Sequence, residues 1–131
     1  MIEIKENPKN GNGFDTVHIF DGWKVAFITC AEQYGEIKTV KRHVITDETF
    51  YLVKGNATLF TSIDGKRFIK TDLEKEKLYV VKKNVWHHLK VSQDALLTVV
   101  ENSNTSKDNT ESKILTKEQI EEIKNDNGCN D

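Results

Sequence analysis

Short runs of β-branched and aromatic residues recur through residues 1–101, and turn signals separate them. The pair Asp64-Gly65 is a strong signal for a two-residue hairpin, and Gly55-Asn56 and Asp21-Gly22 indicate two more turns. Apolar periodicity of the helical kind is nearly absent from this part of the chain. Because consecutive strands joined by tight turns pair antiparallel, the pattern predicts an all-β sandwich or barrel.

The chain divides into a β-rich part and a polar end. We predict strands at 16–20, 23–30, 38–44, 48–54, 57–62, 66–70, 77–81, 86–91 and 95–101. Residues 102–112 are predicted to form a polar linker, and residues 113–127 a helix that packs on the β-rich part. Thr116 and Gln119 form a possible capping box, and two isoleucines give the helix a narrow apolar stripe. A helix that binds a partner is the alternative.

Composition limits the size and the partners of the protein. The 131 residues carry 19 basic and 21 acidic side chains, mixed along the chain, for a formal net charge of -2. This length fits one domain with its own core. Because no basic cluster exceeds a short lysine pair, neither nucleic acid nor an anionic membrane is an expected partner. The first residues show no signal or transit pattern, so we expect a cytoplasmic protein.

Alternation along the strands directs several polar side chains inward. Glu48 shares a strand face with the apolar residues of its run, and a carboxylate there costs several kcal/mol unless it is paired or binds a metal. Lys41 and His43 share one face of the preceding run. The same parity directs His87 inward and His88 to the opposite face. These positions predict a polar site on β-strands.

The spacing of these residues resembles the first signature of the cupins. His43, four residues, Glu48, six residues and Gly55 match most of that signature. Metal-binding cupins usually carry a second histidine two positions before the first of these residues, where this chain has Lys41.

Residues 82–87 resemble the second cupin signature, normally a proline, a spaced glycine and then a histidine. Lys82 replaces the proline, and Asn84 replaces the glycine as a residue that tolerates a left-handed turn. The resemblance implies an antiparallel jelly-roll β-barrel over residues 1–101, followed by one C-terminal α-helix, with a central metal or ligand site.

The resemblance also implies a reduced set of metal ligands, namely His43, Glu48 and His87. Two imidazoles and one carboxylate suit a divalent ion such as iron, zinc, manganese or nickel. Lys41 is expected to contact an anionic group of a ligand or to act as an acid or base, so Lys41 and His43 are the candidate catalytic residues.

Two aromatic residues that follow Glu48 complete the predicted site. Phe50 is expected to line or fill the barrel and to contact a ligand. Tyr51 is predicted to be a packing residue, and its hydroxyl would contact the ligand or transfer a proton if it lies near the cavity.

Three functions follow from this site, and the sequence leaves open whether the protein is an enzyme. The first is a protein that binds a small polar ligand with a divalent metal, with metal-assisted chemistry if it is catalytic. The second is a metal-free enzyme like the nucleotide-sugar ketoisomerases, with His43 as acid or base. The third is a non-catalytic ligand-binding or sensor module. We also expect a homodimer, in which residues 2–5 are candidates for strand exchange or edge pairing.

Overall fold

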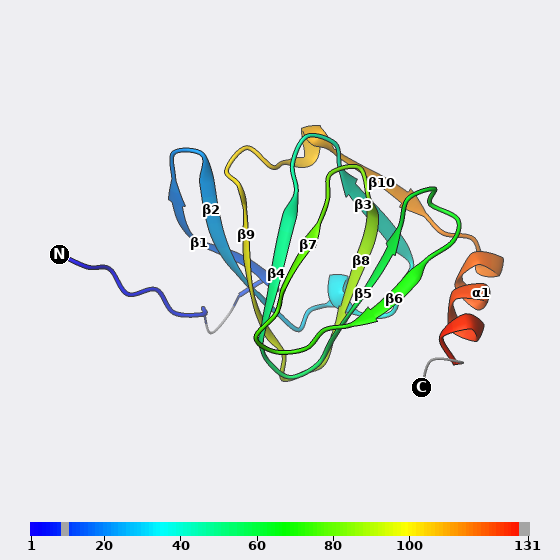
Figure 1. Cartoon of the computed structure of the whole chain (residues 1–131). Coiled ribbons are helices and arrows are strands. Elements are labelled where there is room, and N and C mark those ends of the chain that lie inside the picture. The colour runs from blue at the N-terminus through cyan, green and yellow to red at the C-terminus, as the bar shows by residue number, and fades with distance from the viewer. Residues whose placement is uncertain (9–10, 129–131) are drawn as a thin grey trace.

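The computed structural model describes residues 1–8 and 11–128 and consists mainly of β-strands (Figure 1). The strands are β1 (Phe14–Phe20), β2 (Trp23–Thr29), β3 (Thr39–His43), β4 (Glu48–Lys54), β5 (Ala57–Ser62), β6 (Ile69–Asp72), β7 (Leu78–Val81), β8 (Trp86–Val91), β9 (Leu96–Asn102) and β10 (Thr110–Ile114). Two 3-10 turns, η1 (Glu32–Tyr34) and η2 (Lys107–Asn109), and one helix, α1 (Lys117–Gly128), complete the described elements.

The strands form two five-stranded sheets that face each other. The first sheet has the order β1-β2-β9-β4-β7, and the second has the order β10-β3-β8-β5-β6. Every pair of neighbouring strands in both sheets is antiparallel. The predicted all-β antiparallel class with one C-terminal helix is therefore confirmed.

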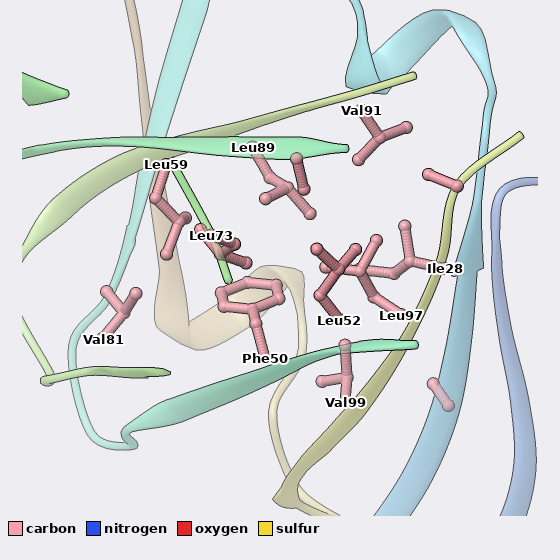
Figure 2. Packing of buried hydrophobic residues seen from close by; sticks show 13 residues of the cluster. Ile28, Phe50, Leu52, Leu59, Leu73, Val81, Leu89, Val91, Leu97 and Val99 are labelled. Carbon is pink, nitrogen blue, oxygen red and sulfur yellow. The ribbon is translucent and has the colours of Figure 1, made fainter. Parts of the chain in front are cut away.

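The main apolar core lies between the inner faces of the two sheets (Figure 2). Phe50 and Leu52 of β4 point toward Leu59 and Leu89 of the second sheet, and all four side chains are buried. Their alternation with exposed residues follows from the two-residue period of a strand. Burying each such side chain contributes about 1.5–3 kcal/mol. The core therefore fixes the position of one sheet relative to the other.

A second apolar cluster lies where α1 meets the outer face of the second sheet. Ile123 of α1 packs with Val40 and Phe60. The capping box predicted at the start of α1 is confirmed. The Thr116 backbone N–H donates to Gln119 Oε1 at 2.9 Å, and the Gln119 backbone N–H donates to Thr116 Oγ1 at 3.1 Å. Among the described residues, no helix is long and apolar enough to cross a membrane.

The structure differs from the sequence prediction in three segments. The expected linker 102–112 ends in strand β10, which pairs with β3, and the helix begins at Lys117 rather than at residue 113. Strand β10 is an exposed edge strand made mostly of polar residues, so its composition does not distinguish it from a linker. It is held by backbone pairing with β3 and by an ion pair between Arg42 and Glu111 at 2.6 Å.

The predicted strand at 66–70 is shifted to Ile69–Asp72. Asp64 Oδ1 accepts hydrogen bonds from the backbone N–H groups of Lys66 and Arg67, which keeps these two residues in the turn. At the N-terminus, residues 1–8 form no strand and are exposed, and in Figure 1 they extend away from the sheets.

Candidate functional site

A cavity of about 1010 Å³ lies between the two sheets and η1. Both sheets contribute polar side chains to its wall: the second sheet supplies His43 and His87, and the first supplies Glu48 and Glu101. The rest of the lining includes Phe14, Tyr34, Phe50 and Leu89, which are partly or fully buried. The cavity therefore combines apolar walls with a small group of titratable residues, as ligand sites commonly do.

Two histidines converge on one carboxylate oxygen in this cavity. The distance from His43 Nε2 to Glu48 Oε1 is 3.0 Å, and the distance from His87 Nε2 to the same oxygen is 3.2 Å. The two imidazole rings lie 5.3 Å apart, measured between their centroids. One ligand atom from each of the three residues lies within 4.8 Å of the other two. The structure therefore brings together the three residues predicted as metal ligands.

The second nitrogen of each imidazole faces a hydrogen-bond acceptor. His87 Nδ1 donates to the Val85 carbonyl at 3.0 Å. His43 Nδ1 lies 2.9 Å from Thr110 Oγ1, whose own proton is donated to the Ser106 carbonyl at 2.7 Å. Since that hydroxyl has one proton, it accepts from His43 Nδ1. Both rings are thus fixed with Nε2 toward the cavity, an arrangement typical of metal-binding histidines.

Two turns place these side chains in register. Asn84 has a φ of 68°, which confirms the left-handed turn predicted for the second signature, and its N–H donates to the His43 carbonyl at 2.7 Å. Gly55 has a φ of 78°, and a Cβ there would lie 2.6 Å from Ala95 Cα. Asparagine and glycine are the residues that adopt this backbone region at low cost. Asn84 and Gly55 therefore contribute to the site by allowing tight turns in the backbone, and not by binding a metal or a ligand.

Glu48 is ionised despite its burial. Burial opposes ionisation, but the hydrogen bonds from His43 and His87, together with the charge of His87, hold the pKa of Glu48 below its ordinary value. An ionised carboxylate between two imidazoles is the form in which Glu48 can bind a metal ion or accept protons.

Glu101 is a site residue that sequence reasoning missed. It lies opposite Glu48 in the pairing of β9 with β4, lines the cavity and is 7% exposed. Burial, its hydrogen bond with Glu48 and the Glu48 charge raise the pKa of Glu101 to about 7, and Lys24 Nζ at 3.3 Å from Oε2 opposes the rise. Inward parity with Leu97 and Val99 on β9 was the available signal, the same one that identified Glu48.

Tyr34 of η1 is a second such residue. It lines the cavity, and burial together with the charges of Glu48 and Glu101 raises the pKa of its hydroxyl above the ordinary value. Tyr34 therefore keeps its proton at neutral pH and presents an O–H donor. No motif marks this position, because η1 is a short turn that only the fold brings to the cavity.

The remaining predicted residues lie at different distances from this centre. Lys41 is exposed and lines the cavity, and it is the pairing partner of His87 across β3 and β8. Phe50 also lines the cavity, with its ring centroid 6.4 Å from that of His87. Tyr51 points to the opposite face of β4, is 37% exposed and is not part of the lining, so the structure does not bring it to the site.

His88 is neither a member of the histidine pair nor a surface residue. Its side chain is half-buried, and Nε2 donates to the Gly35 carbonyl at 2.7 Å, which fixes the turn η1 to β8. Burial lowers the pKa of His88, so the ring is a neutral structural donor at neutral pH.

The fold is similar to those of several solved structures. A cupin-2 domain protein from Shewanella frigidimarina gives a TM-score of 0.53 at 20% identity, over 74% of this chain and 84% of that one. The nucleoside dehydratase Pac13, in a Streptomyces variant with uridine, gives 0.60 at 13% identity, over 90% and 96%. The TDP-quinovose 3,4-ketoisomerase WlaRB from Campylobacter jejuni gives a TM-score of 0.54 at 18% identity, over 73% of this chain and 72% of that one.

No family model and no curated protein matches the sequence. The likeness in structure confirms the resemblance to the cupins at the level of the fold: the chain has a cupin fold, with a histidine and carboxylate cluster between its sheets.

Proposed function

We propose that this protein is a single-domain jelly-roll cupin that binds a small polar ligand, together with a divalent metal ion, between its two sheets. The observation that carries the proposal is the convergence of His43 Nε2, His87 Nε2 and Glu48 Oε1, with both Nδ1 atoms held by acceptors. Solved structures of this fold include proteins named for a nucleoside dehydratase and for sugar ketoisomerases, which supports a small ligand with several polar groups.

The donor set fits a divalent metal. Two imidazole nitrogens and one carboxylate oxygen, with further positions left for water or ligand, suit iron(II), zinc, manganese or nickel. A metal bound here would supply Lewis acidity to a carbonyl or carboxylate of the ligand. Both Nε2 atoms already lie within 3.2 Å of Glu48 Oε1, so an ion held by the three residues would replace the hydrogen bonds between them.

The surrounding residues would bind and orient the ligand. Lys41 at the exposed side of the cavity suits an anionic group, because an ammonium is a compact point charge with three donors. Tyr34 holds an O–H donor in the cavity, and Glu101 holds a proton up to about pH 7. Phe50 supplies an apolar wall next to His87 and limits access of water.

A metal-free acid and base catalyst is the second candidate. The observation that favours it is the continuous network from His43 and His87 through Glu48 to Glu101, in which the imidazoles satisfy the carboxylate without a metal. In such an enzyme His43 would act as the acid or base, which is the role predicted for it in a protein like the nucleotide-sugar ketoisomerases. Turnover of a TDP-linked keto sugar by metal-free protein would support this candidate, and no turnover across a panel of nucleotide sugars and nucleosides would contradict it.

Elemental analysis of untagged protein tests the metal proposal. We expect near-stoichiometric divalent metal in the wild type and its loss in His87→Ala. The matched control is His18→Ala, which removes an exposed imidazole on β1. Absence of metal from wild-type protein after incubation with each of the four ions would contradict the proposal.

A ligand that raises the melting temperature and is recovered unchanged would instead favour a sensor module.

We also propose that the protein is a homodimer, since closed two-fold dimers are the commonest soluble oligomers.

A further inference from the structure

The outer face of the first sheet carries an apolar surface that no described helix covers. Cross-strand pairing from β7 through β4 and β9 to β2 aligns two rows of side chains on this face. The rows consist of Leu78, Tyr51, Thr98 and Phe27, and of Val80, Thr49, Val100 and Val25. Val53 and Trp23 extend the same face at two of its ends, and we call these ten residues the uncovered face.

The exposure of the uncovered face is unlike that of a core. Leu78 is 60% exposed, Val80 48% and Val100 43%, although they lie on neighbouring strands of one sheet. The ten residues include no aspartate, glutamate, lysine or arginine. The Thr49 hydroxyl is already used, since it donates to the Val100 carbonyl at 2.7 Å and accepts from the Val100 N–H at 3.1 Å. An apolar patch of this extent marks an interaction site.

We propose that the uncovered face binds the same face of a second copy of this chain, in a two-fold dimer with two stacked sheets. This inference rests on the homodimer stated above and adds the surface that forms it. In a two-fold dimer each patch meets its own copy, which requires a surface that complements itself. An uncharged, gently twisted sheet face meets that condition, because apolar sheets pack face to face at about 10 Å with strands about 30° apart.

The size of the uncovered face fits a stable dimer. Six of the ten residues are between 37% and 60% exposed. With about 150–250 Å² for each aromatic side chain, these six alone present roughly 500 Å², a large part of the about 800 Å² per partner of standard-size interfaces. A net charge of -2 per chain gives little repulsion between copies. A partner that binds through charged groups would find no charged side chain among these ten residues.

The dimer would leave the cavity open. Glu48 and Glu101 point inward from β4 and β9, whereas their sequence neighbours Thr49 and Val100 lie on the uncovered face. A substitution at Val100 therefore reaches the interface without adding a group to the metal site, so the state of the dimer and the metal content can be measured separately.

Sedimentation of Val100→Glu and Val100→Lys proteins tests this surface. We expect wild-type protein to be a dimer at about 10 μM, and each variant to dissociate at least about a hundredfold more readily, because it places like charges in an apolar interface. An equimolar mixture of the two variants should restore dimers. The control is Ile114→Glu, which adds the same charge at an exposed apolar residue of β10 and should remain dimeric.

The outcomes separate this inference from the proposals on which it rests. Monomeric wild-type protein at about 100 μM would overturn both the homodimer and this surface. Dimeric wild type with dimeric Val100→Glu would overturn only the surface. A single cooperative melting transition and a metal content like that of wild type would show that the variants are folded. If Val100→Glu is unfolded, Val80→Lys on the edge strand β7 replaces it with the same expected dissociation.

Discussion

The two sheets contribute different chemistry to one cavity and have different outer faces. The second sheet supplies the imidazoles of His43 and His87 to the site, and α1 packs on part of its outer side. The first sheet supplies the carboxyl groups of Glu48 and Glu101, and its outer side is exposed and apolar. The site therefore depends on the distance between the sheets, which the core fixes, and changes on either sheet can test how each contributes.

The largest expected effect is on the core that holds the sheets together. Phe50→Ala should lower the free energy of unfolding by about 3–5 kcal/mol, because Phe50 is buried between the sheets. Phe20→Ala removes the same side chain from a position that is 63% exposed on β1 and should cost less than about 1 kcal/mol. Urea denaturation of both proteins measures the difference, and equal losses would contradict this placement of the core.

The next effect concerns the carboxylate that the first sheet provides. Glu48→Gln should weaken binding of Zn²⁺ or Co²⁺ at least about a hundredfold, because an amide oxygen is a poorer ligand and the two imidazoles lose their shared acceptor. Metal competition titrations measure this change. Glu111→Gln on β10, an exposed carboxylate paired with Arg42, is the control and should leave the affinity as in wild type. Unchanged affinity in Glu48→Gln would exclude this metal centre.

A smaller effect should follow from the hydroxyl that orients His43. Thr110→Val removes the acceptor of His43 Nδ1 and should weaken metal binding about tenfold. Thr58→Val, which removes an exposed hydroxyl bonded to Asp72 on the same sheet, is the control. The same titration distinguishes them. If the two variants bind metal equally well, β10 does not position the histidine.

The smallest effect is a pH dependence set by Glu101. Its pKa is raised from 4.5 to about 7, so the folded protein holds this proton more tightly than the unfolded chain does. The stability that Glu101 contributes is complete below pH 4.5 and is lost as the pH rises through about 7. Glu101→Gln should therefore gain stability relative to wild type between pH 5 and pH 8, on the order of 1 kcal/mol.

Urea denaturation of metal-free wild type and variant at several pH values measures this difference. Lys24 and Glu48 face Glu101, so Lys24→Met should enlarge the loss of wild-type stability at high pH. A stability difference between Glu101→Gln and wild type that stays constant from pH 5 to pH 8 would show that Glu101 does not hold its proton in this range.

Local pattern was sufficient for most of the fold. The bounds of β4, β5 and β8 agree with the predicted ranges, and the left-handed turn at Asn84 was expected from its place in the motif. These features depend on alternation, turn chemistry and spacing within a few residues of one another. Strand β10 could not be predicted in this way, since pairing with β3 rather than apolar content makes it a strand.

The sequence by itself determined the antiparallel β class and the C-terminal helix, because alternation and turn signals are local properties. The resemblance to the cupin signatures implied the grouping of His43, Glu48 and His87, which the structure brings together. Only the tertiary structure decided that Glu101 meets Glu48, that Thr110 orients His43 and that Tyr34 lines the cavity. Contacts between distant segments are set by the register between strands and by the packing of one sheet on the other, which local composition does not encode.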